Sequence, residues 1–160
     1  MTPHWADRVT PGRSTDLRSL YRVVPDLVGV VVHQVRLSRF GPALSLRLDL
    51  PRFPDNPPPE WSDLEHLQCH LLFNSVAQVG LTGSVLPSTV AINITDGSAD
   101  RVAVSATGDL TLSFTADAHI HLGRIGAYRD GSTEHRYLGK LERRFTTVPG
   151  PELESFHDRF

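Results

Sequence analysis

The sequence predicts a mainly β protein, in which an antiparallel meander curls into an open sheet, a sandwich or a partial barrel, with one short N-terminal helix. Three observations support this fold class. From residue 28 onward apolar and polar residues alternate, which is the period of a strand with two different faces. Turn-forming residues separate these runs at short intervals. The runs also lack the intervening helices that parallel strands need as crossovers, which favours an antiparallel sheet.

The stretch STDLRSLYRVVPD, residues 14–26, predicts the helix. Asp16 lies in its first turn, where a carboxylate interacts favourably with the positive end of the helix dipole, and Pro25 ends the helical pattern. Spacings of three and four residues place one set of apolar side chains on a single face: Leu17, Leu20, Tyr21 and Val24. We expect this face to dock on the sheet.

The first two predicted strands form a hairpin. In ALSLRLDLP, residues 43–51, the leucines face one way, while Ser45, Arg47 and Asp49 face the other way and are expected in solvent. VHQVRLSRF, residues 32–40, alternates in the same manner, and the sequence FGPA can turn the chain between the two strands.

A stiff connector follows the hairpin. Residues 51–61, PRFPDNPPPEW, contain five prolines, which supply no N–H group and force the backbone to be extended. Neither side of this connector offers enough strands to close a core alone. We therefore expect residues 1–160 to form a single domain, with a tail at 149–160 that either adds a helical turn or stays loose.

The second half of the chain is a series of short strands. The candidates are LQCHLLFNS, AQVGLTGSV, TVAINIT, RVAVSAT, DLTLSFT and AHIHLGRIGAY. The inward positions are expected to be Leu67, Cys69, Leu71, Phe73, Val90, Ile92, Ile94, Val102, Val104, Leu110, Leu112 and Phe114. At such a position Cys69 would act as a small hydrophobic residue rather than as a nucleophile.

Composition narrows the function classes. Lysines and arginines number 16 and acidic residues 18, and a net charge of −2 is too small to steer the whole molecule to nucleic acid or to a membrane. One cysteine forms no internal disulfide, and the N-terminus lacks the pattern of a signal peptide, so we expect a cytoplasmic protein. No phosphate-binding loop, dinucleotide motif or nucleophile–base set is present, which argues against an enzyme and predicts no cofactor.

The stretch DAHIHLGRIGAYRDG, residues 117–131, contains two histidines with a spacing that is found in metal sites. His119 and His121 lie two residues apart and share a strand face, so that a cupin-like metal or small-molecule enzyme is an alternative reading of the chain. A metal site needs at least a third ligand, and the favoured interpretation is two solvated imidazoles. The apolar alternation changes phase after Leu122, which predicts a bulge near Gly123.

Acidic residues gather around the connector. Between Asp49 and Glu65 five acids face one arginine, a local charge of −4 on a segment that prolines hold in shape. Such a segment suits recognition of a basic protein, because the prolines reduce the entropy lost on binding. The candidate partner-binding residues are Asp55, Glu60, Trp61, Asp63 and Glu65. The alternative is a solvated connector whose Trp61 covers the core.

The ordered set of these segments resembles the immunity protein 50 family of actinobacterial polymorphic toxin systems. The resemblance extends over residues 1–131 and rests on MTPHW, LRSLY, the run from PDLVGVVVHQ to PPPEW, LQCHLLFNSVAQVGLTG and ADAHIHLGRIGAYRDG. It implies a small cytoplasmic protein that binds and neutralises a cognate protein toxin, without catalysis and without a cofactor. Among the positions that look recurrent in the family are Trp5, Trp61, Arg124 and Tyr128.

Overall fold

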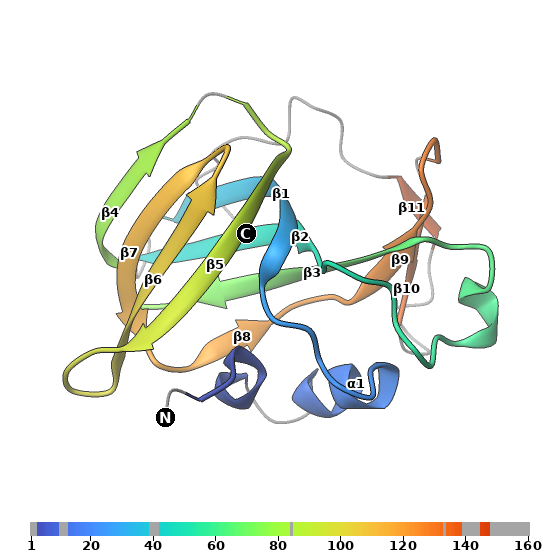
Figure 1. Ribbon diagram of the computed structural model, residues 1–160, viewed down its shortest axis with the longest axis horizontal. Coiled ribbons are helices and arrows are strands. Elements are labelled where there is room, and N and C mark those ends of the chain that lie inside the picture. The colour runs from blue at the N-terminus through green and yellow to red at the C-terminus, as the bar shows by residue number, and fades with distance from the viewer. Residues whose placement is uncertain are drawn as a thin grey trace.

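The computed structural model, shown in Figure 1, describes residues 3–9, 13–38, 42–83, 85–132, 134–138 and 145–147. Eleven strands of this part of the chain form one sheet, and every pair of named strands is antiparallel. Their order is β11-β10-β9-β3-β2-β1-β5-β6-β7-β4, and β8 pairs with β3 beside β9. The two ends of this order are different strands, so the sheet is open, and of the three predicted shapes the curled open sheet is the one observed.

The strands follow the predicted runs closely. The hairpin consists of β1, Val28–Ser38, and β2, Ala43–Asp49, although part of the FGPA turn lies outside the described residues. The remaining strands are β3, His66–Phe73; β4, Ala77–Thr82; β5, Ser88–Asp96; β6, Arg101–Gly108; β7, Thr111–Asp117; β8, Ile120–Leu122; β9, Gly126–Tyr128; β10, Glu134–Tyr137; and β11, Phe145–Thr147. The predicted tail at 149–160 also lies outside the described residues.

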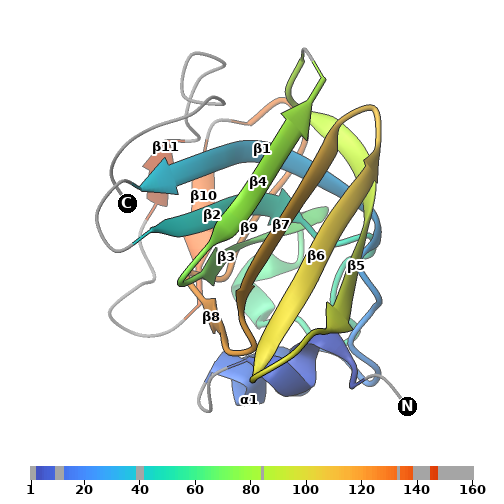
Figure 2. The ribbon, with the colours of Figure 1, turned by 90° about the vertical axis from the view of Figure 1, so that its left-hand side faces the viewer.

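The apolar core lies where the sheet curls over itself. Strands β4–β7 cross the β1–β3 part of the sheet at a steep angle, as Figures 1 and 2 show. Phe73 of β3 and Phe114 of β7 meet in the core with ring centroids 5.0 Å apart at an interplanar angle of 73°. The predicted inward residues are buried, except that Ile94 is half-buried. The alternation of apolar residues therefore identified this face of the sheet correctly.

Two short helices cover the lower end of the sheet. They are η1, Trp5–Arg8, and α1, Arg13–Leu20. Leu17, Leu20 and Tyr21 are buried as predicted, whereas Val24, predicted on the same helix face, lies beyond the helix and is half-buried. The helix ends at Leu20, well before Pro25, and the hydroxyl of Tyr21 then donates to the carbonyl of Arg52 at 2.7 Å. Within the described residues, no helix has the length and apolar character required to cross a membrane.

The second face of β2 differs from the prediction. Ser45, Arg47 and Asp49 were expected in solvent, and this expectation is wrong, because the three residues are only 5%, 3% and 5% exposed. The reason lies in distant strands: Tyr128 of β9 and His135 of β10 stack against each other on this side of the sheet, and Tyr128 reaches Asp49. Alternation of apolar and polar residues indicates that a strand has two different faces. It does not indicate whether another element of the fold covers the polar face.

The predicted bulge near Gly123 is present. Leu71 of β3 pairs with Leu122, but Gln68 pairs with Gly126, so the side of β8 and β9 contains one extra residue. The N–H of Gly123 donates to the carbonyl of His70 at 2.8 Å across this irregularity. A Cβ atom at Gly123 would approach the Cβ of His70 to 3.0 Å, which explains the glycine.

Candidate functional site

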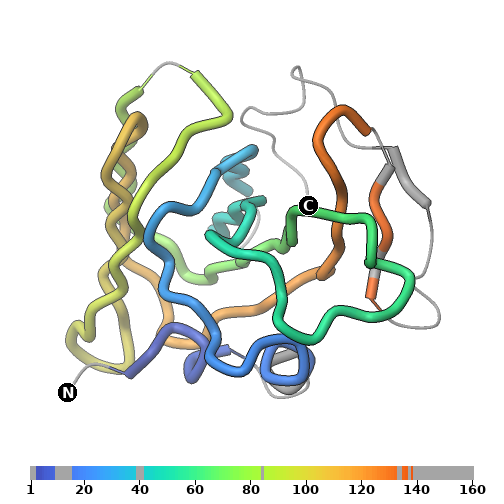
Figure 3. The backbone as a smooth tube through the Cα atoms, turned by 45° about the vertical axis from the view of Figure 1, so that its right-hand side comes forward, coloured from blue at the N-terminus to red at the C-terminus, as the bar shows by residue number. Residues whose placement is uncertain are grey.

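The Pro-rich connector emerges from β2, passes through η2, Pro59–Trp61, and returns to β3 on the side of the molecule away from β5–β7 (Figure 3). The structure exposes the side chains of Asp55, Asp63 and Glu65 and leaves Glu60 half-buried. Four of the five predicted binding residues are therefore accessible at least in part. Asp55 lies in the first half of the connector, whereas the other acids flank η2.

Arginines from distant parts of the chain offset these acids. Asp55 accepts a bond from the backbone N–H of Arg22 at 2.9 Å and pairs with Arg52 at 3.1 Å. These contacts, the first above all, hold the pKa of Asp55 below its usual value. Arg136 donates to Asp63 at 2.9 Å, and Arg129 lies 3.8 Å from the same carboxylate.

The local charge of −4 therefore describes the sequence rather than the folded surface. Arg22, Arg129 and Arg136 add positive charge beside the connector, and Asp130, next to Glu65 and His66, adds a negative charge. Sequence reasoning missed them because Arg129 and Arg136 are more than sixty residues from the acid that they contact. The surface has mixed charge rather than a uniform acidic potential.

Trp61 covers the core, which is the alternative to a role as an exposed binding residue. Its side chain is 1% exposed and belongs to the core, with the ring of Phe53 at a centroid distance of 6.4 Å. The carbonyl of Glu60 accepts a hydrogen bond from Arg136 of β10. The buried ring of Trp61 therefore anchors η2 to the core, and the polar residues around it form the accessible surface.

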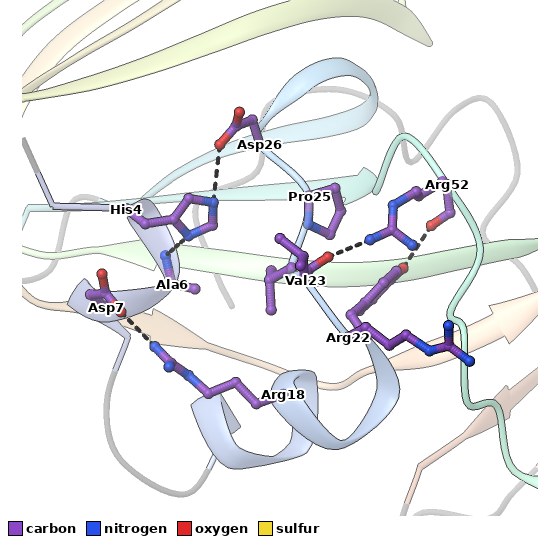
Figure 4. Close-up of a pocket in the computed structure, with 11 residues that line it drawn as sticks. His4, Ala6, Asp7, Arg18, Arg22, Val23, Pro25, Asp26 and Arg52 are labelled. Atoms are coloured by element: carbon purple, nitrogen blue, oxygen red, sulfur yellow. Dashed lines mark hydrogen bonds and ion pairs between the residues drawn. The ribbon is translucent and has the colours of Figure 1, made fainter.

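A groove in two parts adjoins the start of the connector. The first hollow, of about 650 Å³, lies among η1, the end of α1, residues 21–26 and Arg52 (Figure 4). The second, of about 520 Å³, extends toward β5 and shares three lining residues with the first: His4, Asp7 and Asp26. His4 and Asp26 meet at 3.1 Å. We refer to the two hollows together as the His4–Asp26 groove.

Ion pairs and side-chain contacts shape the His4–Asp26 groove. Arg18 of α1 pairs with Asp7 of η1 at 2.5 Å, which ties the two helices together. The guanidinium of Arg52 donates to the carbonyl of Val23 and lies 5.0 Å from the centre of the Tyr21 ring. Figure 4 shows these contacts from one side of the first hollow. The lining combines charged side chains with exposed apolar side chains. A surface of this kind can bind a partner that has both charged and apolar groups.

A buried polar network lies on the second face of the sheet. The register of β1 against β2 shifts between Val32 and Gln34, and His33 at the shift places Nε2 2.9 Å from Oδ2 of Asp49. The hydroxyl of Tyr128 donates to the same oxygen, while Gln68 donates to Oδ1 at 3.1 Å. Gln68 in turn accepts from Arg47 at 3.4 Å. Asp49 is the centre of this network.

Burial and hydrogen bonding shift the pKa values of Asp49 and His135. Burial alone would raise the pKa of Asp49, but the contacts of His33, Tyr128 and Gln68 outweigh it, and the pKa lies below the usual value. Burial lowers the pKa of His135 to about 4, with Arg47 contributing in the same direction. At neutral pH an ionised carboxylate is therefore surrounded by hydrogen-bond donors, beside a neutral imidazole.

Sequence reasoning missed this network because Arg47 and Asp49 alternate with leucines in the manner of an exposed strand face. The available signal was the partner strand, where His66, Gln68 and His70 also alternate with apolar residues. Polar residues on two neighbouring strands indicate a shared polar face. Its closure by Tyr128 and His135 depends on long-range pairing that a single sequence does not reveal.

In the described part of the chain, His119 and His121 do not join a third possible metal ligand. His119 and His121 are exposed. Within the described residues, the one group of three possible ligands whose ligand atoms lie within 4.8 Å of one another is Glu65, His66 and Asp130, which contains neither histidine. In that group His66 is hydrogen-bonded to Asp130 at 2.8 Å, and the two carboxylates are exposed while His66 is half-buried.

Cys69 points into the core as the alternation predicts. The thiol is fully buried, and burial raises its pKa to about 12. A thiolate nucleophile needs a lowered pKa and access to a substrate. Cys69 is therefore a core residue.

These features define a class of protein: a curled antiparallel β-sheet protein with an open groove and a rigid, mixed-charge connector on its surface. A family model described as Immunity protein 50 matches residues 14–128, and the chain belongs to this family. The predicted family is thereby confirmed, although the matched region begins after η1. No curated protein and no solved structure matches the chain.

Proposed function

We propose that this protein is a non-catalytic immunity protein that binds a cognate polymorphic toxin in the cytoplasm of the producing cell and blocks its action. The observation that carries the proposal is the family match over residues 14–128. The surface supports it, because the connector and the adjoining groove combine fixed backbone, charged side chains and apolar area. Interfaces gain affinity from preorganised surfaces and specificity from arranged charges.

The proposed binding face includes Asp55, Glu60, Asp63 and Glu65 on the connector. Trp61 is buried and keeps η2 in place, so its contribution to toxin binding is indirect. Because arginines stand beside the acids, the face suits a partner with both basic and acidic groups. The ion pairs on this face are exposed, and they serve recognition and association rate more than affinity.

The direct test uses a candidate toxin domain encoded by a gene beside this one. The proposal expects a specific complex in a calorimetric titration, together with survival of cells that express both proteins. A toxin that kills equally well with and without this protein, and that shows no heat of binding, would overturn the proposal.

Charge reversal tests the connector separately. We expect Asp55→Lys, Glu60→Lys and Asp63→Lys together to weaken the complex by more than tenfold, and circular dichroism verifies that the variant is folded. Asp109→Lys, an exposed acid between β6 and β7, is the matched control and should bind as the wild type does. Unchanged affinity of the triple variant would remove the connector from the interface.

A further inference from the structure

Residues 23–27 line the His4–Asp26 groove. The carbonyls at alternate positions are bound inward: Val23 accepts from Arg52, Pro25 from Nε1 of Trp5 at 2.9 Å, and Leu27 from the N–H of Ile92 at 2.7 Å. Pro25 also restricts the residue before it to extended backbone. The chain bends at Val23 and at Leu27, and only residues 24–26 between them run without a bend. Along this short run the N–H and C=O groups of Val24 and Asp26 point to the side opposite the bound carbonyl of Pro25.

The intervening residues are Val24 and Asp26. Neither backbone forms a hydrogen bond with any residue that the structure describes. Backbone N–H and C=O groups in that position form a short edge that an extended peptide can pair with. Pro25 does not interrupt this edge, because its backbone belongs to the inward-facing set.

Exposed apolar side chains lie at both ends of the same segment. Val23 is 73% exposed and lines the first hollow, and Val28 is 62% exposed and lines the second. They are two of the five large apolar side chains that are exposed in the described part of the chain. Apolar area beside an unpaired backbone edge is the combination that strand-addition sites use, since the backbone gives affinity and the side-chain contacts give selectivity.

The charge at the centre of the groove is negative. The Asp26 carboxylate is 79% exposed and stands where the two hollows meet, held by His4. Arg18, Arg22 and Arg52 also line the first hollow; Arg18 pairs with Asp7 and Arg52 with Asp55, and the backbone N–H of Arg22 donates to Asp55. Asp7 and Asp26 line the second hollow, where no described arginine or lysine does, so Asp26 is the acid placed to receive a basic side chain from that side.

We propose that an extended segment of the toxin, carrying a lysine or an arginine, binds in the His4–Asp26 groove. The segment pairs its backbone with Val24 and Asp26, rests apolar side chains on Val23 and Val28, and places its basic group against the Asp26 carboxylate. This inference rests on the proposed function and names a further part of the binding face. The groove and the connector are continuous through Arg52 and Asp55.

Affinity measurements with the neighbour-encoded toxin domain test the groove. Asp26→Lys and Val23→Lys are each expected to raise the Kd by more than tenfold. The matched controls are Asp109→Lys and Val85→Lys, which alter an acid and a 67% exposed valine elsewhere on the surface, and both should stay within twofold of the wild type. Circular dichroism verifies folding of each variant.

Hydrogen exchange gives a second readout that needs no substitution. In the complex with the wild-type protein, the amides of Val24 and Asp26 should exchange more slowly than in the free protein. If the complex forms but these amides stay unprotected and the groove variants bind normally, the groove proposal is wrong and the proposed function stands. If the wild-type protein forms no complex, both proposals fail together.

Discussion

At the scale of single residues, the Asp49 network is the most constrained part of the molecule. The carboxylate is 5% exposed and ionised, and such a group is stable only while its hydrogen bonds are intact. Loss of one donor is therefore expected to reduce the free energy of unfolding by more than the strength of that one hydrogen bond, because the buried charge of Asp49 loses part of its compensation. Because Tyr128 also stacks on His135 with centroids 4.8 Å apart, a change at Tyr128 tests hydroxyl and ring separately.

Tyr128→Phe removes the hydroxyl and keeps the ring. We expect a loss of about 1–2 kcal/mol in the free energy of unfolding, because a buried carboxylate loses one donor. Urea denaturation at neutral pH measures this loss. A variant as stable as the wild type would show that Asp49 does not depend on this bond.

The buried His135 predicts acid sensitivity. Its pKa is about 4 in the folded protein and 6.5 as the ordinary value, so the unfolded chain binds the proton more tightly. Stability should fall as the pH drops from 6.5 towards 4, by about 2 kcal/mol at pH 5 from this residue. The depressed pKa of Asp49 extends the loss at lower pH.

Denaturation at pH 7.5 and at pH 5 measures this effect. His135→Gln should reduce the difference in stability between the two pH values. Equal pH dependence in the wild type and in His135→Gln would contradict the assignment.

At the scale of elements, the largest buried side chain of the connector is that of Trp61. Trp61 is among the largest fully buried residues, and it anchors η2. Trp61→Ala should cost about 3–5 kcal/mol in the free energy of unfolding through the cavity it leaves. Val85→Ala, on the surface, should change it by less than about 0.5 kcal/mol. A small effect at Trp61 would mean that the connector holds its shape without this ring.

The elements also show what a single sequence can reveal. The helix face at Leu17, the hairpin leucines and the bulge at Gly123 were all predicted, because each depends on neighbours in the chain. The burial of the polar face of β2 was not predicted, because Tyr128, which covers Asp49, lies about eighty residues away in the sequence. The groove was also missed, since η1, α1 and Arg52 meet there only after folding.

At the scale of the whole molecule, one apolar core includes residues from Trp5 to Ala127. A shared core predicts one cooperative unfolding transition, as expected of the single domain proposed for residues 1–160. Trp5→Phe and Trp61→Phe each leave one tryptophan, in the connector and in η1 respectively. Fluorescence of each variant should follow the same thermal transition as its far-ultraviolet circular dichroism. Two separated transitions would indicate two independent units.

The partner-binding surface was only partly predictable for a related reason. Acids that are close in sequence identified the connector, but the arginines that neutralise them, Arg22, Arg129 and Arg136, come from other elements. Charge counted along a segment is therefore a poor guide to the potential of a folded surface. The family assignment, in contrast, depends on the ordered pattern of the chain and could be predicted from the sequence.

The protein is proposed to protect its producer by binding a toxin. A titration of the neighbour-encoded toxin domain with the wild-type protein, in which toxin activity is measured at each step, tests this function most directly. We expect a saturable loss of activity that is complete at a fixed molar ratio. Full toxin activity in the presence of a large excess of this protein would contradict it.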